Sequence, residues 1–228
     1  MTLFLALSCL QGRPRSSAAA ELMSLDVDGL QLTPGNPPDL AFEGELRAAG
    51  TPFRTHHGYI ETCLRGPVWD GVRCVSSSDS VHPPRLDKGN ESRAQEAEWR
   101  RAETPGCAIE LMYPGYMLGT GEGAEWAMEA KLPLVVDVSH IHIQRSQGVM
   151  EERTWRKLQD YEHILEVHVS ANEGQHDSHR PLGAGSFGLD WARAKMRSGT
   201  LCVLECYMHR LEMDARQRQV ALLRGQAS

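Results

Sequence analysis

The feature that most constrains the fold is a regular alternation of short apolar runs with longer segments of helical character. The apolar runs span residues 3–9, 29–34, 53–58, 71–76, 107–113, 132–138, 164–170 and 201–207. Several of these runs are apolar at nearly every position, which is expected of parallel strands buried on both faces. The segments between the runs contain helix candidates at 15–25, 38–49, 91–103, 122–131, 151–161, 189–198 and 212–224.

Eight strands that alternate with helices predict an α/β fold of the (β/α)8 TIM barrel type. An open, doubly wound sheet is the competing architecture, because it has the same alternation. The length of 228 residues suits one domain over residues 1–228. The gap between His57 and Gly71 is short for a helix, so we expect one outer helix of this compact barrel to be missing or reduced to a turn.

Composition excludes several classes of protein. Hydrophobic residues make up 41% and charged residues 24% of the chain, which is ordinary for a globular protein. There is no apolar run long enough to span a membrane. The net charge of -6 argues against binding nucleic acid through bulk positive charge. The six scattered cysteines are typical of a reduced, cytoplasmic protein. The start of the chain, MTLFLALSC, resembles a short signal or lipoprotein segment ending at Cys9, but it lacks a positive segment and its apolar run is short, so we favour a buried first strand.

Chemically active side chains recur at the ends of the predicted strands. In a barrel, the loops after the strands form one concave face, and catalytic groups gather there. From the third run onward, every run ends in, contains or leads to a carboxylate or an imidazole. These side chains are His56 or His57, His82, Glu110, Asp137 with His140, His168 with Asp177 and His179, and Glu205.

Two of these residues need a cationic partner. A single histidine at a strand end is usually a hydrogen-bonded rim residue, but Glu110 and Glu205 lie inside apolar runs. An unpaired carboxylate there costs several kcal/mol. No lysine or arginine recurs at the strand ends, whereas imidazoles do. Mixed nitrogen and oxygen donors suit Zn²⁺, Mn²⁺ or Fe²⁺, so the pattern predicts a metal centre at the barrel mouth.

One long segment carries a resemblance to a known family. The stretch HVSANEGQHDSHRPLGAGSFGLDW, residues 168–191, resembles the sugar phosphate isomerase/epimerase families of the xylose isomerase-like TIM barrel superfamily, which also includes endonuclease IV (AP endonuclease family 2). The stretches CAIELM (107–112), VVDVSHIHI (135–143) and LCVLEC (201–206) resemble the strands of that superfamily that carry metal ligands. The resemblance extends from residue 54 to residue 205.

The resemblance implies a set of metal ligands and one to three ions of Mn, Zn, Fe or Co. Four residues match the ligands that hold a single ion in the epimerase-type members: Glu110, Asp137, His168 and Glu205. Five others match the wider set of the endonuclease-type members, which hold three ions: His56, His82, His140, Asp177 and His179. His56 is preferred over His57 because Tyr59 follows it at the spacing common in these families.

Three chemistries follow from this resemblance. In an isomerase or epimerase of a sugar or polyol, which we favour, Glu110 and Glu205 exchange a proton with the substrate. In an endonuclease IV-like phosphodiesterase, clustered ions act on a nucleic acid backbone. In a multinuclear iron oxygenase, the substrate is a peptide; those proteins carry Asn-Asn where this chain has Ser139-His140. A non-catalytic scaffold barrel is a fourth interpretation, and the oligomeric state stays open.

Overall fold

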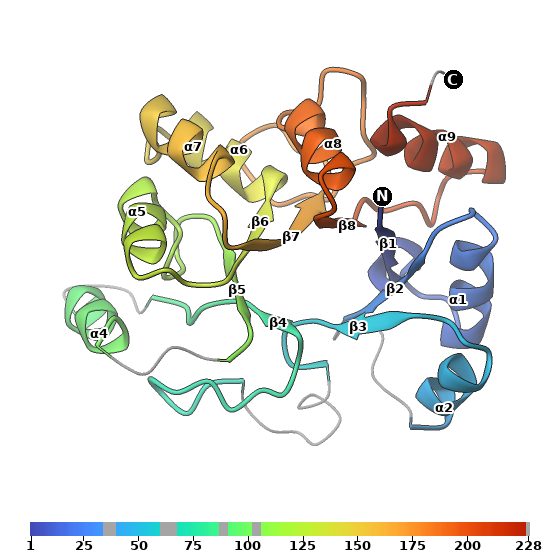
Figure 1. Cartoon of the computed structure of the whole chain (residues 1–228), viewed down its shortest axis with the longest axis horizontal. Helices are drawn as coiled ribbons and strands as arrows, with labels where there is room; N and C mark the ends of the chain where they lie inside the picture. Colours follow the sequence, from blue (N-terminus) through green and yellow to red (C-terminus); the bar gives the residue numbers. More distant parts are fainter. Residues whose placement is uncertain (34–39, 60–67, 87–90, 102–105, 227–228) are drawn as a thin grey trace.

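In the computed structural model of the chain, eight parallel strands form a nearly closed barrel surrounded by helices (Figure 1). The structure describes residues 1–33, 40–59, 68–86, 91–101 and 106–226. The strands pair in the order β3-β2-β1-β8-β7-β6-β5-β4. They are β1 (Leu3–Ala6), β2 (Gly29–Leu32), β3 (Phe53–Thr55), β4 (Ser80–Val81), β5 (Ala108–Leu111), β6 (Leu134–Asp137), β7 (Ile164–Val169) and β8 (Leu201–Leu204). The predicted (β/α)8 barrel is therefore confirmed, and the open sheet is excluded.

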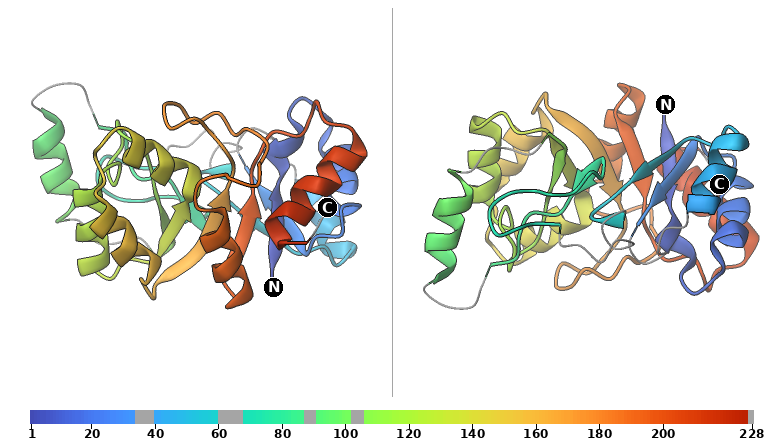
Figure 2. Two further views of the ribbon diagram at one scale, coloured as in Figure 1. Left: turned by 90° about the horizontal axis from the view of Figure 1, so that it is seen from above. Right: turned by 90° about the horizontal axis from the view of Figure 1, so that it is seen from below.

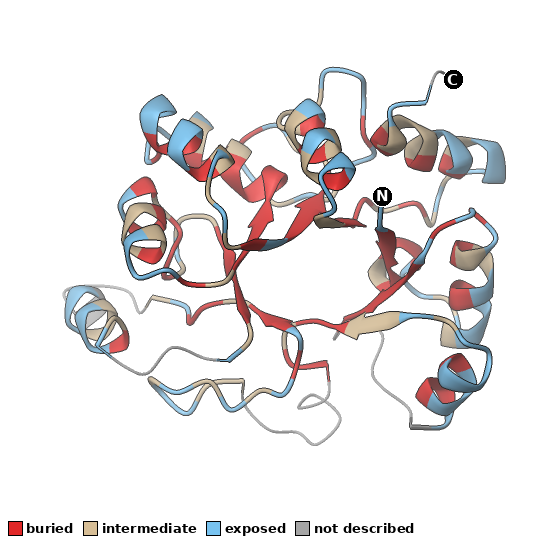
Figure 3. Ribbon diagram, viewed as in Figure 1, coloured by how far each residue is buried: buried red, intermediate tan, exposed pale blue. Residues whose placement is uncertain are grey.

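The described helices lie outside the strands, and Figure 2 shows this from two further directions. They are the 3-10 helix η1 (Leu7–Leu10) and α1 (Arg15–Met23), α2 (Leu40–Ala48), α4 (Glu91–Trp99), α5 (Gly121–Glu129), α6 (Val138–Ser146), α7 (Glu152–Gln159), α8 (Leu189–Arg197) and α9 (Met213–Arg224). Helices such as α5, α7 and α8 have a buried side, drawn in red in Figure 3, whereas α4 buries Trp99 against Trp69 and Trp126. Helix α7, for example, buries Trp155 and Leu158 and exposes Arg156 and Lys157, as an amphipathic helix does. Within the described ranges, no helix combines the length and the apolar character that a membrane span requires.

The barrel closes between β3 and β4 through a narrow seam. His56 and Ser80 form an isolated parallel bridge there. The backbone N–H of His57 donates to the carbonyl of Ser80 at 2.7 Å, and the N–H of Asp79 donates to the carbonyl of Thr55 at 3.1 Å. These few hydrogen bonds join the two ends of the sheet.

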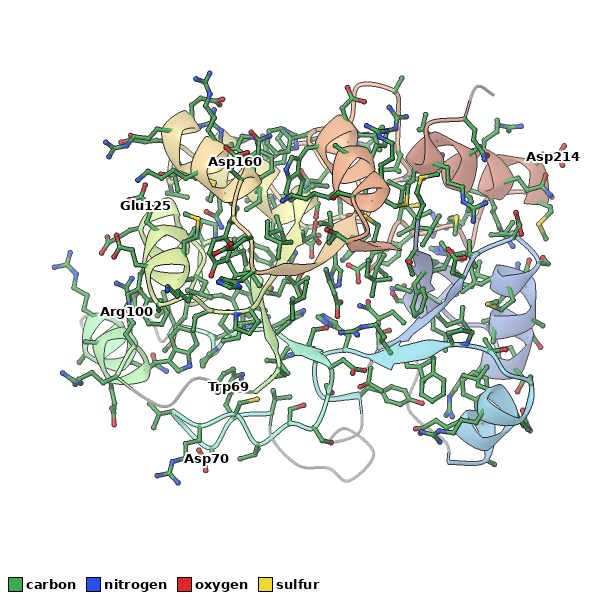
Figure 4. The ribbon with its side chains drawn as sticks, in the orientation of Figure 1. Trp69, Asp70, Arg100, Glu125, Asp160 and Asp214 are labelled. Atoms are coloured by element: carbon green, nitrogen blue, oxygen red, sulfur yellow. The ribbon has the colours of Figure 1, made fainter. Side chains whose placement is uncertain are left out.

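The fourth strand does not lie where the sequence analysis placed it. Residues 71–76 form no strand of the barrel; instead Trp69 and Cys74 pair in an antiparallel bridge around a turn. Asp70 accepts a hydrogen bond from the N–H of Arg73 at 3.1 Å, and Gly71 has a φ of 102°. The Asp-Gly turn therefore determines the local structure. In Figure 4, Asp70 points outward from this loop, and side chains fill the space inside the ring of strands.

The other elements follow the sequence more closely. Strands lie within the other seven predicted runs, and helices lie within or overlap all seven candidate segments. Helix α6 was not among the predicted helices; it begins at Val138, directly after β6. The expected loss of an outer helix between His57 and Gly71 concerns residues that lie largely outside the described ones. Residue 34 of the second predicted strand and residues 38–39 and 102–103 of two predicted helices also lie outside them.

Candidate metal centre

The nine predicted donors lie together at the carboxyl end of the barrel strands. A cavity of about 260 Å³ opens there. Its lining includes His56, His82, Glu110, His140, Asp177, His179 and Glu205. Asp137 and His168 are fully buried and contact these lining residues. Parallel strands deliver their ends to one face of a barrel, so residues far apart in the chain meet at this cavity.

Glu110, on β5, lies at the centre of the cluster. Its side chain is 1% exposed. Its Oε2 atom lies 3.2 Å from Nε2 of His56 and 3.1 Å from Nε2 of His82. Its Oε1 atom lies 3.3 Å from Nδ1 of His140 and 3.5 Å from Nδ1 of His168. Burial raises the pKa of Glu110, but the surrounding histidines, His168 and His82 foremost, outweigh burial and hold the pKa well below its usual value.

A second group of donors adjoins Glu110 on the side of α6. Nε2 of His140 lies 3.6 Å from Oδ2 of Asp137 and 3.2 Å from Oδ2 of Asp177. Asp177 in turn lies 3.2 Å from Nε2 of His179. On the side of β8, Nδ1 of His168 lies 3.4 Å from Oε1 of Glu205. The donors therefore form one continuous network across the mouth.

The loop after β7 brings Asp177 and His179 to this network. Ala171 and Arg180 pair in an antiparallel bridge, with N–H···O distances of 2.9 and 2.7 Å, so the loop folds back on itself. His179 has a φ of 43°, a left-handed conformation that turns the chain sharply. The carbonyl of His179 accepts a hydrogen bond from the N–H of Tyr207 at 2.7 Å, which ties the loop to the segment after β8.

The donor set fits a divalent metal ion. Among the described residues, Oε2 of Glu110, Oδ2 of Asp137 and Nδ1 of His168 are buried without a hydrogen-bond partner. Buried polar atoms normally have partners, so orphaned ones at one place indicate an absent ligand. The ligand atoms of three groups lie within 4.8 Å of one another: His56, Glu110 and His168; Glu110, Asp137 and His140; Asp137, His168 and Glu205. Nitrogen and oxygen donors in this mixture suit Zn²⁺, Mn²⁺ or Fe²⁺.

The shifted pKa values in the cluster also indicate a site for a cation. Burial raises the pKa of Asp137 to about 6, because burial and the charges of Glu110 and Glu205 outweigh the charge of His140. Burial lowers the pKa of His168, but the charges of Glu205 and Glu110 outweigh it, and the pKa lies well above its usual value. Without metal, these buried carboxylates therefore retain protons on the neighbouring imidazoles. A divalent cation would replace those protons, which is the usual exchange when a metal binds His and carboxylate ligands.

His56 and His57 have different surroundings. His56 reaches Glu110, whereas the ring of His57 stacks on the ring of His82 at 3.8 Å between centroids. Nδ1 of His57 accepts a hydrogen bond from the N–H of His82 at 3.1 Å. Burial, followed by the charge of His82, lowers the pKa of His57 to about 2. The geometry thus favours His56 as the donor and gives His57 a supporting position.

Sequence reasoning missed two groups of polar residues at this site. One is a layer of polar side chains below the cluster, in which Gln31, Ser80 and Glu166 are buried and Arg54 is half-buried. Glu166 precedes His168 by two residues on β7, so strand alternation could have placed it on the same face. Tyrosines surround the mouth: the ring of Tyr113 lies 5.0 Å from that of His140, and the ring of Tyr207 lies 5.0 Å from that of His179.

Comparison with known proteins identifies the fold. No protein-family model matches the chain, and no curated protein does either. A D-tagatose 3-epimerase-like protein is similar in structure, with a TM-score of 0.62 and 14% identity over 96% of this chain and 95% of that one. The 3-keto-D-glucoside 4-epimerase from E. coli has a TM-score of 0.59 and 13% identity over 99% of each chain. The TTHB071 protein from Thermus thermophilus, in crystals soaked with ZnCl2, has a TM-score of 0.57 and 18% identity over 100% of each.

Proposed function

From the xylose isomerase-like TIM barrel fold of the chain, we propose that it is a divalent-metal-dependent enzyme. The proposed reaction is the isomerisation or epimerisation of a sugar or polyol by metal-assisted proton transfer. The observation that carries this proposal is the buried donor cluster with its orphaned atoms at the barrel mouth. The proposed ligands of one ion are Glu110, Asp137, His168 and Glu205.

The chain's own residues would perform the proton transfer. A bound ion would polarise vicinal oxygens of a hydroxy-ketone and lower the pKa of the adjacent C–H bond. The carboxylates of Glu110 and Glu205 both line the cavity and both face the ring of His168. One carboxylate would remove the carbon-bound proton, and the other, protonated, would return a proton to the opposite face of the substrate.

The cavity supports a small substrate. Its volume of about 260 Å³ lies just below the range of about 300–1,000 Å³ typical of small-molecule sites. Tyr207 lines the cavity, and its ring offers an apolar face and a hydroxyl to a polyol. Two of the similar structures are described as an epimerase or as epimerase-like, and both of their names include a sugar. These observations favour a sugar or polyol over a polymer.

Metal content and proton exchange test this proposal. We expect protein purified without added metal to hold at least one equivalent of Mn, Fe, Zn or Co by elemental analysis. Solvent deuterium should enter a ketose or polyol substrate from a test panel, and E205Q and E110Q should abolish the exchange. E173Q is the matched control: Glu173 is exposed in the loop after β7, and this variant should exchange deuterium normally. Less than a tenth of an equivalent of metal, with no binding on addition, would overturn the proposal.

One observation favours a second candidate, a multinuclear phosphodiesterase. The donor network includes five side chains beyond the four proposed for one ion: His56, His82, His140, Asp177 and His179. Phosphodiester hydrolysis uses clustered ions that stabilise the attacking and leaving oxygens. This candidate expects two or three ions per chain and cleavage of a duplex that contains an abasic site. One ion per chain and an uncut duplex would contradict it.

A further inference from the structure

A charged layer lies inside the barrel, immediately below the donor cluster. Glu166, on β7, is fully buried and faces the same side of the strand as His168. Its carboxylate forms an ion pair with the guanidinium of Arg54 from β3. The hydroxyl of Ser80 donates to Oε2 of Glu166 at 3.4 Å, and the amide of Gln31 approaches the same oxygen at 3.5 Å. Side chains from β2, β3 and β4 therefore fix this carboxylate.

Glu166 reaches the ring nitrogen of His168 that faces away from the cluster. Its Oε2 atom lies 3.2 Å from Nε2 of His168, and the side-chain amide nitrogen of Gln31 lies 3.0 Å from the same ring nitrogen. An ionised carboxylate only accepts hydrogen bonds, so the hydrogen between these atoms belongs to Nε2. The other ring nitrogen, Nδ1, has no hydrogen-bond partner and lies 3.5 Å from Glu110 and 3.4 Å from Glu205. The ring thus turns Nδ1 toward the cluster, where a bound ion would replace the proton that Nδ1 carries in the metal-free protein.

Stability alone does not explain the ion pair. The interior of a TIM barrel is normally packed by branched apolar side chains. Replacing a buried ion pair by apolar residues of similar volume is often neutral or stabilising, because desolvation offsets the attraction between the charges. Arg54 and Glu166 therefore add little that apolar residues could not supply. Their distinctive contribution is the hydrogen bond to His168.

We propose that Glu166, held in place by Arg54, is a positioning residue that keeps the Nε2 hydrogen of His168 and directs Nδ1 toward a bound metal ion. This inference rests on the proposed metal function and extends it to residues beyond the ligands. Carboxylates that bind the far nitrogen of a ligating histidine change metal affinity by about 10–100-fold. Glu166 therefore sets the affinity of the site without contact with the ion.

A double variant separates positioning from folding. E166Q alone leaves the charge of the half-buried Arg54 without its carboxylate partner and should destabilise the fold. R54M/E166L removes both charges and keeps apolar bulk in the layer. We expect the metal-free double variant to unfold within a few degrees of the wild type. Its dissociation constant for Mn²⁺, measured by calorimetry, should rise about 10–100-fold.

The ring hydrogen itself provides a test that needs no variant. In the Zn²⁺-loaded wild type, nitrogen-15 spectra of the histidine side chains should show the proton of His168 on Nε2. A proton on Nδ1 would overturn the inference, whatever the variants do. In the double variant we expect this signal to shift or broaden, because the ring has lost the acceptor that fixes it.

A second buried ion pair serves as the control. Arg216 is 3% exposed and pairs with Glu21, joining α9 to α1, and neither residue lines the cavity. E21Q should lower the unfolding temperature and leave Mn²⁺ affinity unchanged. If the wild type binds no Mn²⁺ or Zn²⁺, the proposed function fails. If the wild type binds and R54M/E166L binds equally well, only the positioning role of Glu166 is wrong.

Discussion

His56 and His57 are adjacent in sequence, yet their rings have different surroundings. Nε2 of His56 faces Glu110, whereas His57 stacks on His82 with its Nδ1 atom already occupied by a backbone N–H. His57 also has a φ of 43°, which asparagine tolerates better than most residues. The variants H56N and H57N are therefore a matched pair. The effect of each substitution on metal affinity depends on what the lost imidazole ring contacts.

We expect H56N to weaken Mn²⁺ binding at least tenfold, because it removes an imidazole that faces the cluster. H57N should change the affinity less than about threefold, because its ring supports His82 from behind. Calorimetric titration of the two metal-free variants measures the difference. Equal losses of affinity in H56N and H57N would show that the two rings share the site.

The buried cysteines should be unreactive. Burial raises the pKa of the Cys202 and Cys206 thiols to about 12 in each case. Because the pKa is raised, the thiolate that reacts with iodoacetamide is scarce at pH 8, and reaction should increase only at more alkaline pH. Peptide mapping by mass spectrometry should find Cys74, which is half-buried, modified well before both. Labelling of Cys206 at the rate of Cys74 in the folded protein would contradict this expectation.

At the scale of the element, Asp137 has two tasks at the junction of β6 and α6. Its Oδ1 atom accepts the N–H of Ser139 at 2.6 Å and so caps the helix. Its Oδ2 atom has no hydrogen-bond partner and faces the cluster. One oxygen of Asp137 therefore stabilises helix α6, and the other is available to a metal ion.

Two substitutions of Asp137 should separate these tasks. D137N retains a capping oxygen, so the metal-free protein should be at least as stable as the wild type at pH 7, where the charge of the buried carboxylate is unfavourable. D137A also loses the cap and should be less stable than D137N by about 1 kcal/mol. Both should lose most metal affinity. Denaturant unfolding with and without Mn²⁺ measures these effects; equal stabilities of D137N and D137A would show that the cap contributes little.

The same junction explains why α6 was missed. The run 132–138 is apolar apart from Asp137, and polar and apolar residues alternate in the following HIHIQ (140–144), a pattern that is also typical of a strand. The capping geometry of Asp137 ends the strand and begins the helix, but an aspartate is also an expected metal ligand there, and that interpretation obscured its role as a cap. At β4 the opposite happened: apolar residues in 71–76 indicated a strand, and the turn at Gly71 prevented it.

At the scale of the whole molecule, metal binding should stabilise the fold. A ligand at about 100 times its dissociation constant adds about 2.7 kcal/mol to the free energy of unfolding. For a domain of this size, that corresponds to a rise of roughly 5–10 °C in the unfolding temperature. We expect Mn²⁺ added to EDTA-treated protein to produce such a shift in differential scanning calorimetry, and E110Q to abolish it. An unchanged Tm at saturating Mn²⁺ would contradict the prediction.

The positions of the nine donors could be predicted because the barrel topology alone sends every strand end to one face. No side-chain detail was needed to bring His56 near Glu110 or Asp137 near His140. The layer of Arg54 and Glu166 required more, because it depends on which strands lie opposite each other and on their register. A glutamate in an apolar strand indicates that a partner exists, but it does not identify an arginine more than a hundred residues away.

The narrow seam between β3 and β4 links the integrity of the barrel to the integrity of the site. His56 forms the isolated β-bridge of that seam with Ser80, and its ring faces Glu110. Local opening of the seam would move His56 away from Glu110. The other seven strand pairings, which run from β3 through β1 and β8 to β4, would stay intact. Amide hydrogen exchange in the seam should therefore be faster in the metal-free protein than in the metal-bound protein, because the ion would hold the two ends of the sheet together.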